Sequence, residues 1–268
     1  MTDKPIRVAV AGAKGRMGRE VVKMLVQEPD FSFVVGIDAH LDGVDVGTTN
    51  GLGELGVPFV RDLERALDTY RPDVLVDFTT PEVVRRHVEA ALDRGVRPVV
   101  GTTGLSETDV EELARHAEMR GVGGVIAPNF AIGAVLMMKF AQMAAKYLPH
   151  VEIIELHHDQ KLDAPSGTAL KTAEGIQRVR AEFRQGHPDE KELVGGARGA
   201  YVGGFRIHSV RLPGLIAHQE VLFGGEGQLL TIRHDALSRA CFMPGVALAI
   251  RRVMTLNRLV YGLEHLLD

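Results

Sequence analysis

The strongest constraint on the fold is a glycine-rich turn near the N-terminus, between an apolar run and a helical pattern. Residues 6–11 (IRVAVA) form the apolar run, and glycines follow at positions 12, 15 and 18 with the spacing GxxGxxG. Gly12 permits a tight turn, Gly15 lets the backbone approach a pyrophosphate, and Gly18 lets the helix pack closely on the strand. A second β-rich segment ends at Asp38, 20 residues beyond Gly18, where an acceptor for the ribose hydroxyls of a dinucleotide belongs. The chain is therefore predicted to begin with a dinucleotide-binding unit.

The residues around Asp38 bear on the choice of cofactor. A carboxylate accepts hydrogen bonds from the ribose hydroxyls of NADH and repels the 2′-phosphate of NADPH. Lys14 and Arg16 in the glycine loop could offset the charge of that phosphate, while the residue after Asp38 is Ala39 and not an arginine. We expect the protein to prefer NADH and to accept NADPH.

Apolar strands and helical segments keep alternating up to about residue 130. We expect strands at 73–78, 98–101 and 124–127, a helix that begins at Thr80-Pro81, and a helix over 107–120. Such alternation predicts a doubly wound parallel α/β sheet, whose ligands bind at the carboxyl ends of the strands. Most residues at these ends are small or polar, and those predicted to bind the cofactor are Gly12, Ala13, Lys14, Gly15, Arg16, Met17, Asp38, Gly101, Thr102, Thr103, Ala127, Pro128, Asn129 and Phe130.

The second half of the chain has a different pattern, typical of an α+β domain with a mixed sheet. The expected elements are helices over 132–147 and 168–183, a strand over 151–156, a loop over 184–204, and three strands in an antiparallel run at 205–211, 218–223 and 229–234. Two covering helices would leave one face of this sheet apolar, and an oligomer would bury it. A final helix over 245–256 would return to the first domain. We therefore expect a dinucleotide-binding domain over 1–130, joined by 240–268, and a substrate-binding and oligomerisation domain over 131–239.

The run EIIELHHDQKLDAPSGTA combines proton carriers with a place for an anion. His157 and His158 end an expected strand, and Lys161 lies three residues beyond them. Histidine gains or loses a proton near neutral pH, which suits general acid catalysis. Ser166 or Thr168 would cap the helix that follows, and the backbone amides at its positive end suit a carboxylate or phosphate. This run predicts acid catalysis on a small acidic substrate.

Composition excludes several other classes of protein. A net charge of −4 gives no bulk attraction for nucleic acid or an anionic membrane. The single cysteine, Cys241, cannot form an intrachain disulfide or a cysteine-based zinc site, and it fits a reducing compartment. The first apolar run is too short for a signal peptide, and Pro128-Asn129 interrupts the uncharged stretch 121–138. We expect a cytoplasmic protein without a membrane span.

Three other histidines and one arginine lie on or next to the expected strands of the second half. His208, His218 and His234 fall on expected strands, but no carboxylates occupy matching positions and no HxH pattern is present. We therefore expect no metal site. Arg239, just beyond the last strand, could reach an acidic substrate, and the sequence leaves this open.

These motifs resemble those of the dihydrodipicolinate reductase family. The run over 155–169 matches the pattern E-x-H-H-x-x-K-x-D-x-P-S-G-T-A at every fixed position. The segments GAKGRMG, DFTTPE, VVGTTG and APNFAIG look like further family motifs in the family's order, and HSVRLPGLIAHQEVLFGGEGQLLTIRHDALSR looks like its last strands. The resemblance covers nearly the whole chain. It implies a Rossmann-type domain and an α+β domain that assembles a homotetramer.

The resemblance also implies an activity and roles for individual residues. The family reduces 4-hydroxy-tetrahydrodipicolinate, through dihydrodipicolinate, to tetrahydrodipicolinate with NAD(P)H in diaminopimelate and lysine biosynthesis. His157 would be the general acid that protonates a ring carbon, and Lys161 would be a second proton donor. The residues that would hold the small dicarboxylate substrate are His158, Ser166, Gly167 and Thr168. The alternatives are an NAD(P)-dependent dehydrogenase of another small acid and a non-catalytic dinucleotide-binding redox sensor.

Overall fold

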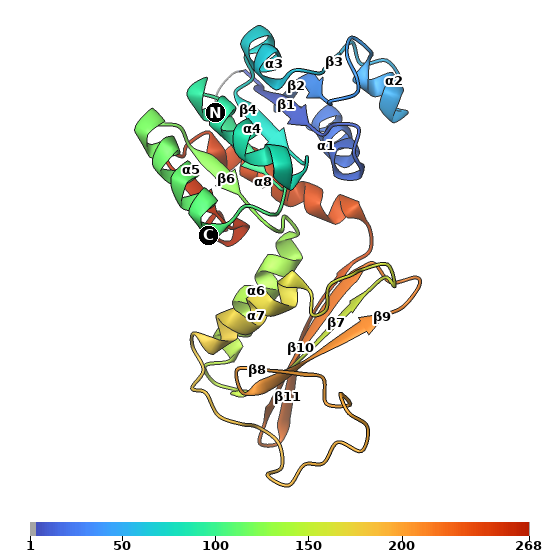
Figure 1. Cartoon of the computed structure of the whole chain (residues 1–268), viewed down its shortest axis with the longest axis vertical. Helices are drawn as coiled ribbons and strands as arrows, with labels where there is room; N and C mark the ends of the chain where they lie inside the picture. The colour runs from blue at the N-terminus through green and yellow to red at the C-terminus, as the bar shows by residue number, and fades with distance from the viewer. Residues whose placement is uncertain (1–3, 268) are drawn as a thin grey trace. The chain divides into compact units, whose positions relative to one another are not determined.

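The computed structural model describes residues 4–267. The chain divides into two compact units (Figure 1): the described residues up to Phe130 together with those from Phe242 onward, and Ala131–Cys241. Each unit is built around its own β-sheet. Among residues 4–267, no helix has the length and apolar character needed to cross a membrane.

The sheet of the first unit has seven strands within the described residues, all parallel, in the order β12-β6-β5-β4-β1-β2-β3. The strands are β1 (Ile6–Ala11), β2 (Phe31–Ile37), β3 (Phe59–Val60), β4 (Val74–Asp77), β5 (Arg97–Val100), β6 (Gly124–Ile126) and β12 (Leu259–Tyr261). Because β1 lies between β2 and β4, the winding of the chain reverses there, and such a point binds ligands at the carboxyl ends of the strands. The predicted Rossmann-type sheet is confirmed.

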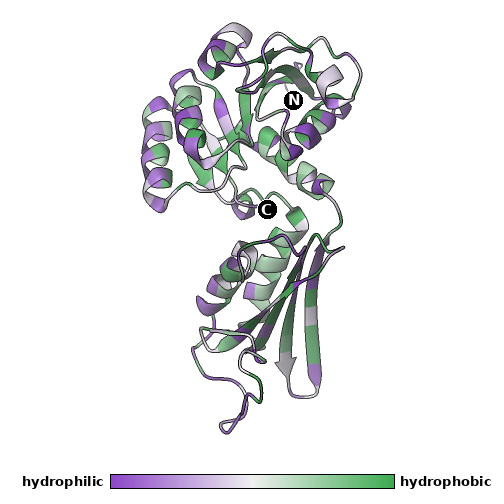
Figure 2. Ribbon diagram, turned by 45° about the vertical axis from the view of Figure 1, so that its right-hand side comes forward, coloured by the Kyte–Doolittle hydropathy of each residue, from purple (hydrophilic) through white to green (hydrophobic). Residues whose placement is uncertain are grey.

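Amphipathic helices cover this sheet. They are α1 (Arg16–Gln27), α2 (Val46–Asn50), α3 (Leu63–Tyr70), α4 (Pro81–Asp93), α5 (Glu107–Arg120) and α8 (Met243–Val253), with the short 3₁₀ helix η2 (Leu263–His265). A second 3₁₀ helix, η1 (Arg239–Phe242), lies at the boundary between the two units. Figure 2 shows the helices striped green and purple, because one face of each packs inward and the other meets solvent. In α1 the buried face includes Val21, Val22 and Leu25. Helix α8, from the C-terminal end of the chain, contacts α1 and the strands β5 and β6.

The glycine turn brings the first helix very close to the first strand. Gly12 has a φ of +76°, which residues with a side chain rarely adopt. A Cβ atom on Gly18 would lie 2.0 Å from the carbonyl oxygen of Gly12, so only glycine allows this approach. The start of α1 is thereby fixed over the carboxyl end of β1.

The second unit has a five-stranded mixed sheet within the described residues, in the order β11-β10-β7-β9-β8. Its strands are β7 (His150–His157), β8 (Ala200–Val202), β9 (Phe205–Arg211), β10 (Ala217–Gly225) and β11 (Gln228–Ala236), and its helices are α6 (Ile132–Ala144) and α7 (Gly167–Gln177). Strand β7 is parallel to β9 and antiparallel to β10. Helices α6 and α7 lie side by side on one face of the sheet (Figure 1), where Ile153, Val221 and Ile176 are part of the core.

The opposite face of this sheet is less apolar than expected. Glu152 on β7 pairs there with His208 on β9 at 2.6 Å and with Arg198 at 2.7 Å. Glu220 on β10 pairs with Arg233 on β11 at 2.8 Å. Exposed apolar side chains such as Leu229 occur beside these ion pairs. The prediction of an apolar face was therefore wrong where these ion pairs lie.

Two predictions about the strands of the second unit were also wrong. Residues 205–211, 218–223 and 229–234 do not form one antiparallel run, because β7 lies between β9 and β10. The expected loop over 184–204 contains the short strand β8, which pairs with β9. The position of β7 depends on pairing between distant segments, about which the local pattern carries little information. The pairing of β8 with β9 is instead local, a hairpin in which Val202 is opposite Phe205.

Both helices of the second unit end earlier than expected. The helix predicted over 132–147 ends at Ala144, and the one predicted over 168–183 ends at Gln177. Beyond α7, the buried guanidinium of Arg180 donates hydrogen bonds to the carbonyl oxygens of Pro149 and Gly203. These long-range hydrogen bonds hold the chain away from the helical path.

Two glycine-to-alanine substitutions are expected to have opposite effects on stability. Gly18→Ala should lower the free energy of unfolding by about 1–3 kcal/mol, because the new methyl group has no room. Gly175→Ala in α7, where a Cβ meets no other heavy atom within 4 Å, should raise it by about 0.5–1 kcal/mol. Urea denaturation followed by circular dichroism measures both. A Gly18→Ala protein as stable as the unsubstituted one would contradict this account of the turn.

Candidate active site

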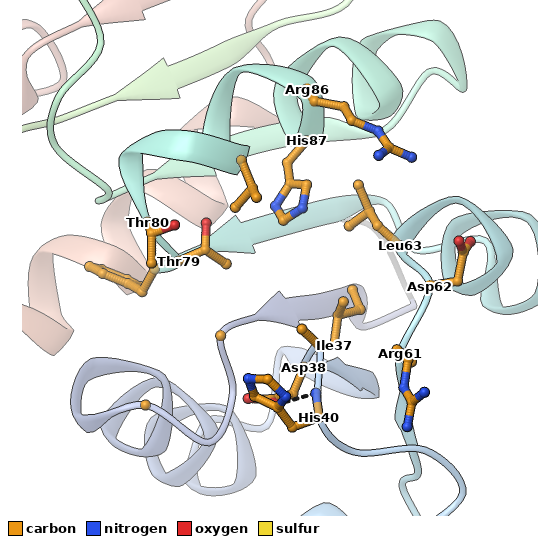
Figure 3. A pocket seen from close by; sticks show the side chains of 15 residues that line it. Ile37, Asp38, His40, Arg61, Asp62, Leu63, Thr79, Thr80, Arg86 and His87 are labelled. Atoms are coloured by element: carbon orange, nitrogen blue, oxygen red, sulfur yellow. Dashed lines mark hydrogen bonds between the residues drawn. The ribbon is translucent and has the colours of Figure 1, made fainter.

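A cavity of about 500 Å³ lies in the first unit, at the carboxyl ends of its strands (Figure 3). It is lined by Gly12, Gly15, Ile37, Asp38, Ala39, His40, Arg61, Asp62, Leu63, Phe78, Thr79, Thr80, Val83, Arg86 and His87. Of the predicted cofactor-binding residues, the cavity brings together Gly12, Gly15 and Asp38. Arg61 and Arg86 also line the cavity. Sequence reasoning missed these two arginines because no local motif marks either position.

The residues around the glycine turn fit a dinucleotide. Helix α1 begins after Gly15, which offers no capping side chain, and its first turn contains no acidic residue. Its first amides and its positive dipole end therefore suit a pyrophosphate. A Cβ on Gly12 would lie 2.5 Å from the carbonyl oxygen of Phe78, so the close approach of these two strand ends also requires glycine.

Charged residues of both signs line the cavity. The carboxylate of Asp38 accepts a hydrogen bond from the amide of His40 at 3.0 Å. Arg61 lies just beyond β3, and Arg86 on α4 forms an exposed ion pair with Glu64 at 3.1 Å. The cavity wall thus carries two carboxylates, Asp38 and Asp62, and two guanidinium groups.

A buried carboxylate joins two of the strand ends. Asp77, the last residue of β4, is fully buried, and its Oδ1 accepts hydrogen bonds from Thr79 Oγ1 at 2.6 Å and Thr102 Oγ1 at 2.7 Å. Its Oδ2 lies 2.7 Å from Nδ1 of His87 on α4. This network fixes the turn after β4, the turn after β5 and one wall of the cavity.

The remaining predicted cofactor residues lie around the same edge of the sheet but do not line the cavity. Their positions are as follows: Lys14 and Arg16 are exposed, Ala13 is buried, Met17 is half-buried in α1, Gly101–Thr103 follow β5, and Ala127–Phe130 follow β6. The hydroxyl of Thr102 is engaged by Asp77, so only its backbone is available to a ligand. Phe130 is buried, with its ring centroid 5.9 Å from that of Phe78.

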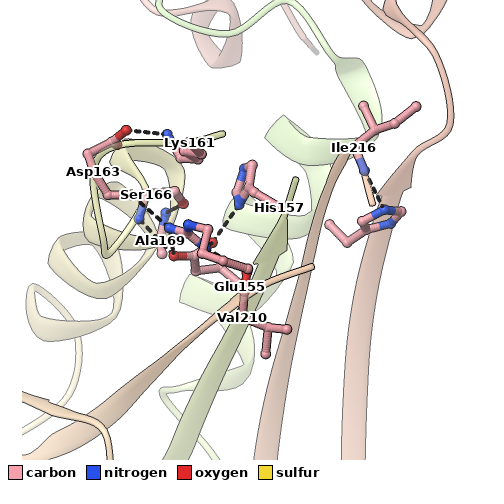
Figure 4. A network of polar contacts seen from close by, with 10 residues as sticks. Glu155, His157, Lys161, Asp163, Ser166, Ala169, Val210 and Ile216 are labelled. Atoms are coloured by element: carbon pink, nitrogen blue, oxygen red, sulfur yellow. Dashed lines mark hydrogen bonds and ion pairs between the residues drawn. The ribbon is translucent and has the colours of Figure 1, made fainter. Parts of the chain in front are cut away.

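A second group of polar residues lies in the second unit, at the end of β7 (Figure 4). Glu155 is fully buried, and His157 Nδ1 lies 2.5 Å from its Oε2. Arg211 on β9 binds both carboxylate oxygens, at 2.8 Å and 2.9 Å. The amide of Ser166 donates to Oε1 at 3.2 Å. The sequence placed Glu155 in the motif without a role, and nothing local to Arg211 indicated that it meets this carboxylate.

The electrostatics of this group favour a charged Glu155. Burial acts to raise the pKa of Glu155, but hydrogen bonds from Arg211, Ser209 and His157 outweigh it and hold the pKa below its usual value. Burial lowers the pKa of His157; the hydrogen bond and negative charge of Glu155 act in the opposite direction, while the cations Lys161 and Arg211 add to the lowering. His157 therefore loses its proton more readily than an ordinary histidine.

The loop between β7 and α7 places the other predicted residues near His157. Lys161 Nζ pairs with Asp163 at 2.6 Å, and the carbonyl oxygen of His158, which is exposed, accepts from the Lys161 amide at 3.2 Å. Ser166, and not Thr168, caps α7, since its hydroxyl accepts from the amide of Ala169.

The first turn of α7 is open to a ligand. A Cβ on Gly167 would meet no other heavy atom within 4 Å, which indicates open space at the helix start. The amides of Gly167 and Thr168 precede any acceptor within the helix and can bind an anion. The structure thus places Gly167 and Thr168 together at one helix terminus that follows directly from the His157–Lys161 loop.

The other residues considered from the sequence have partners or lie apart. His208 pairs with Glu152, and His218 pairs with Asp235 at 2.6 Å. Across residues 4–267, no cluster of three or more histidine, cysteine, aspartate or glutamate side chains has the arrangement of a metal site. Arg239 is exposed in η1.

A doubly wound sheet with this glycine turn, together with a buried Glu–His pair beside a lysine, defines an oxidoreductase that uses a nicotinamide nucleotide. Family models named "Dihydrodipicolinate reductase, N-terminus" and "Dihydrodipicolinate reductase, C-terminus" match residues 6–130 and 133–267. The chain belongs to the dihydrodipicolinate reductase family.

Individual relatives are similar over their whole length. The chain is 59% identical over 263 residues to the 4-hydroxy-tetrahydrodipicolinate reductase of Geobacillus thermodenitrificans, covering 98% of this chain and 99% of the relative. It is 57% identical over 268 residues to the enzyme of the same name from Bacillus velezensis, covering 100% of both chains.

Solved structures extend the comparison to the fold. A dipicolinate-bound dihydrodipicolinate reductase from Paenisporosarcina sp. TG-14 superposes with a TM-score of 0.89 and 52% identity, over 98% of this chain and 100% of that one. An amine dehydrogenase from Mycobacterium smegmatis, with a TM-score of 0.70 and 16% identity over 98% of this chain and 96% of that one, shares the fold alone.

The Asp77 network is expected to contribute to stability. Asp77→Asn keeps only one acceptor oxygen, so either the threonine hydroxyls at Oδ1 or His87 at Oδ2 lose their carboxylate partner, and the free energy of unfolding should fall by about 1–3 kcal/mol. Asp73→Asn is the matched control, because Asp73 precedes the same strand and accepts a single hydrogen bond from the Arg7 amide. Urea denaturation measures both variants. Equal losses of stability would show that burial of Asp77 has no special role.

Proposed function

We propose that the chain reduces 4-hydroxy-tetrahydrodipicolinate, through dihydrodipicolinate, to tetrahydrodipicolinate with NADH or NADPH, in diaminopimelate and lysine biosynthesis. This is the activity in the names of its full-length relatives. The observation that carries the proposal is the His157–Glu155 contact beside Lys161 and the open start of α7. A redox sensor has no need of such proton donors, so this alternative is not favoured.

The substrate is a small dicarboxylate, and the first turn of α7 suits one of its carboxylates. The Gly167 and Thr168 amides, the positive end of the helix and the nearby Lys161 ammonium all favour negative charge. The exposed His158 and the hydroxyl of Ser166 complete the proposed substrate-binding residues. Dipicolinate, the ligand of the solved relative, is itself an aromatic dicarboxylate, which supports this proposal.

Reduction of the substrate adds a hydride to one ring carbon and a proton to its neighbour. The reduced nicotinamide supplies the hydride when it is bound at the glycine turn and the strand ends of the first unit. His157 supplies the proton from its imidazolium form, and Lys161 is a second donor that also stabilises the developing negative charge. Because the acid must be protonated, activity falls as the pH rises through the pKa of His157.

The cofactor site is proposed to favour NADH while accepting NADPH. Asp38 supports NADH, since its carboxylate can accept hydrogen bonds from the ribose hydroxyls and repels a 2′-phosphate. Arg61 and Arg86 line the same cavity as Asp38 and support acceptance of that phosphate. Lys14 and Arg16 are exposed near the turn and can add to this attraction.

We also propose that the protein is a cytoplasmic homotetramer. The face of the second sheet opposite α6 and α7 carries apolar side chains among ion pairs, a mixture that suits contact with another copy. Its single cysteine fits a reducing compartment.

Replacing the proposed acid should slow the chemical step. We expect His157→Ala to lower kcat by roughly 10²–10⁴-fold while the circular dichroism spectrum stays unchanged. The measurement is substrate-dependent oxidation of NADH, with the unstable substrate made in place from pyruvate and aspartate semialdehyde by the preceding synthase. His158→Ala is the matched control and should raise KM more than it lowers kcat. Near-normal turnover by His157→Ala would remove His157 from the mechanism.

Removing the charge of Asp38 should change the cofactor preference. Asp38→Asn is expected to raise the ratio of kcat/KM for NADPH to that for NADH roughly 10–100-fold, through loss of a charged hydrogen bond and of the repulsion of phosphate. Asp62→Asn is the control: it also removes a negative charge from the cavity wall, while asparagine still caps α3. An equal change in both variants would mean that Asp38 acts only through general electrostatics.

A further inference from the structure

We propose that Glu155 and Arg211 are positioning residues that hold the His157 ring with Nδ1–H toward the protein, so that Nε2 is the atom that delivers the proton. This inference rests on the proposed role of His157 as the general acid. It adds two residues that do not touch the substrate and act through the imidazole.

The register of the sheet brings these residues together. Strand β7 is parallel to β9, with Glu155 opposite Ser209 and His157 opposite Arg211. On the same face of β7, Ile153 packs into the core beneath the helices, so Glu155 and His157 also lie on the side that α6 and α7 cover. The pairing joins residues that are 56 positions apart in sequence, Glu155 and Arg211.

The buried carboxylate is held from several directions. Arg211 binds both of its oxygens, which is the strong bidentate geometry of arginine and carboxylate. The Ser166 amide donates a further hydrogen bond, and the Ser209 side chain acts to lower the pKa of the carboxyl group. With these donors in place Glu155 remains ionised despite complete burial, and it can only accept a hydrogen bond from His157.

This arrangement determines which ring nitrogen carries the fixed proton. At 2.5 Å from an ionised carboxylate, Nδ1 of His157 must be the donor in both the neutral and the charged imidazole. The proton that is gained and lost is then the one on Nε2. In Figure 4 the ring of His157 extends away from the Glu155 carboxylate, which leaves Nε2 on the side opposite the hydrogen bond.

Arg211 also holds the loop that contains Lys161. Its Nη2 donates to the carbonyl oxygen of Asp163 at 2.7 Å, and Asp163 pairs with Lys161. The amide of the next residue, Leu212, donates to the carbonyl oxygen of His157 at 3.1 Å. One arginine therefore connects the proposed acid, its carboxylate partner and the loop with the second proton donor.

The charges that face His157 make the contribution of Glu155 measurable. Lys161 and Arg211 are cations that lower the pKa of His157, burial lowers it further, and Glu155 opposes them. The carboxylate of Asp163 pairs with Lys161, and its negative charge also acts to raise the pKa of Arg211. Without the charge of Glu155, the imidazolium would face two cations, one of them newly unpaired, and would lose its proton at lower pH.

The same strand provides a matched control. Glu152 pairs with His208 at 2.6 Å and with Arg198 at 2.7 Å, a second set of glutamate, histidine and arginine. It lies on the opposite face of the sheet, three residues before Glu155. A substitution there removes the same kind of charge from the same strand without touching His157.

The test is the pH dependence of kcat/KM for Glu155→Gln, Glu155→Asp and Glu152→Gln. In Glu155→Gln the fall of activity with rising pH should move to lower pH by about one unit or more, because an opposite charge next to the imidazolium is lost. In Glu155→Asp the charge remains, so this limb should stay near its original pH while kcat falls. Glu152→Gln should leave the limb in place. A Glu155→Gln limb at the original pH would overturn the proposal.

A second measurement does not depend on folding of the Glu155 variants. Nitrogen-15 NMR of the unsubstituted protein with labelled histidine should show neutral His157 as the Nδ1–H tautomer, assigned by the loss of its signals in His157→Ala. A neutral Nε2–H tautomer would overturn the positioning role. If His157→Ala kept its turnover, the acid role itself would fail, yet the tautomer would still report whether Glu155 orients the ring.

Discussion

A fully buried carboxylate needs partners, and in the second unit this requirement organises the site. Glu155 is ionised and buried among the strands beneath α7, so Arg211, Ser209, Ser166 and His157 must all point toward it. They come from three parts of the chain: β9, the start of α7 and the end of β7. Satisfying one charge therefore fixes the strand register, the position of the helix terminus and the orientation of the imidazole together.

The first unit contains a parallel arrangement. Asp77 is equally buried at the end of β4, and it too accepts hydrogen bonds from threonine hydroxyls and contacts a histidine through Nδ1. No arginine joins the hydrogen-bonded contacts described for Asp77, and its histidine lines the cavity of the glycine turn. In both units a buried acidic side chain near a strand end accepts hydrogen bonds from residues of neighbouring turns. These hydrogen bonds hold the turns in place.

Much of this fold could be predicted from the sequence wherever the information is local. The bounds of β1, α5 and β9 agree with the expected segments Ile6–Ala11, Glu107–Arg120 and Phe205–Arg211. An apolar run marks the first, a Ser106 cap begins the second, and apolar and polar residues alternate in the third. The order of β9, β7 and β10 was not predictable in this way, since it depends on pairing across about 50 residues, whose energy no local pattern reflects. The early end of α7 has the same origin in the long-range hydrogen bonds of Arg180.

The same distinction between local and long-range information applies to the candidate site. A motif such as HH-x-x-K identifies the residues that can exchange protons, since their chemistry is visible in their type and spacing. It does not identify the groups that set the protonation of His157, because Arg211 comes from another strand and resembles an ordinary surface arginine in sequence. The pKa of His157 follows from the balance of burial, one carboxylate and two cations, and that balance exists only after the sheet has formed. The pKa of His157 is therefore a property of the fold, while the presence of a side chain that can exchange a proton is visible in the sequence.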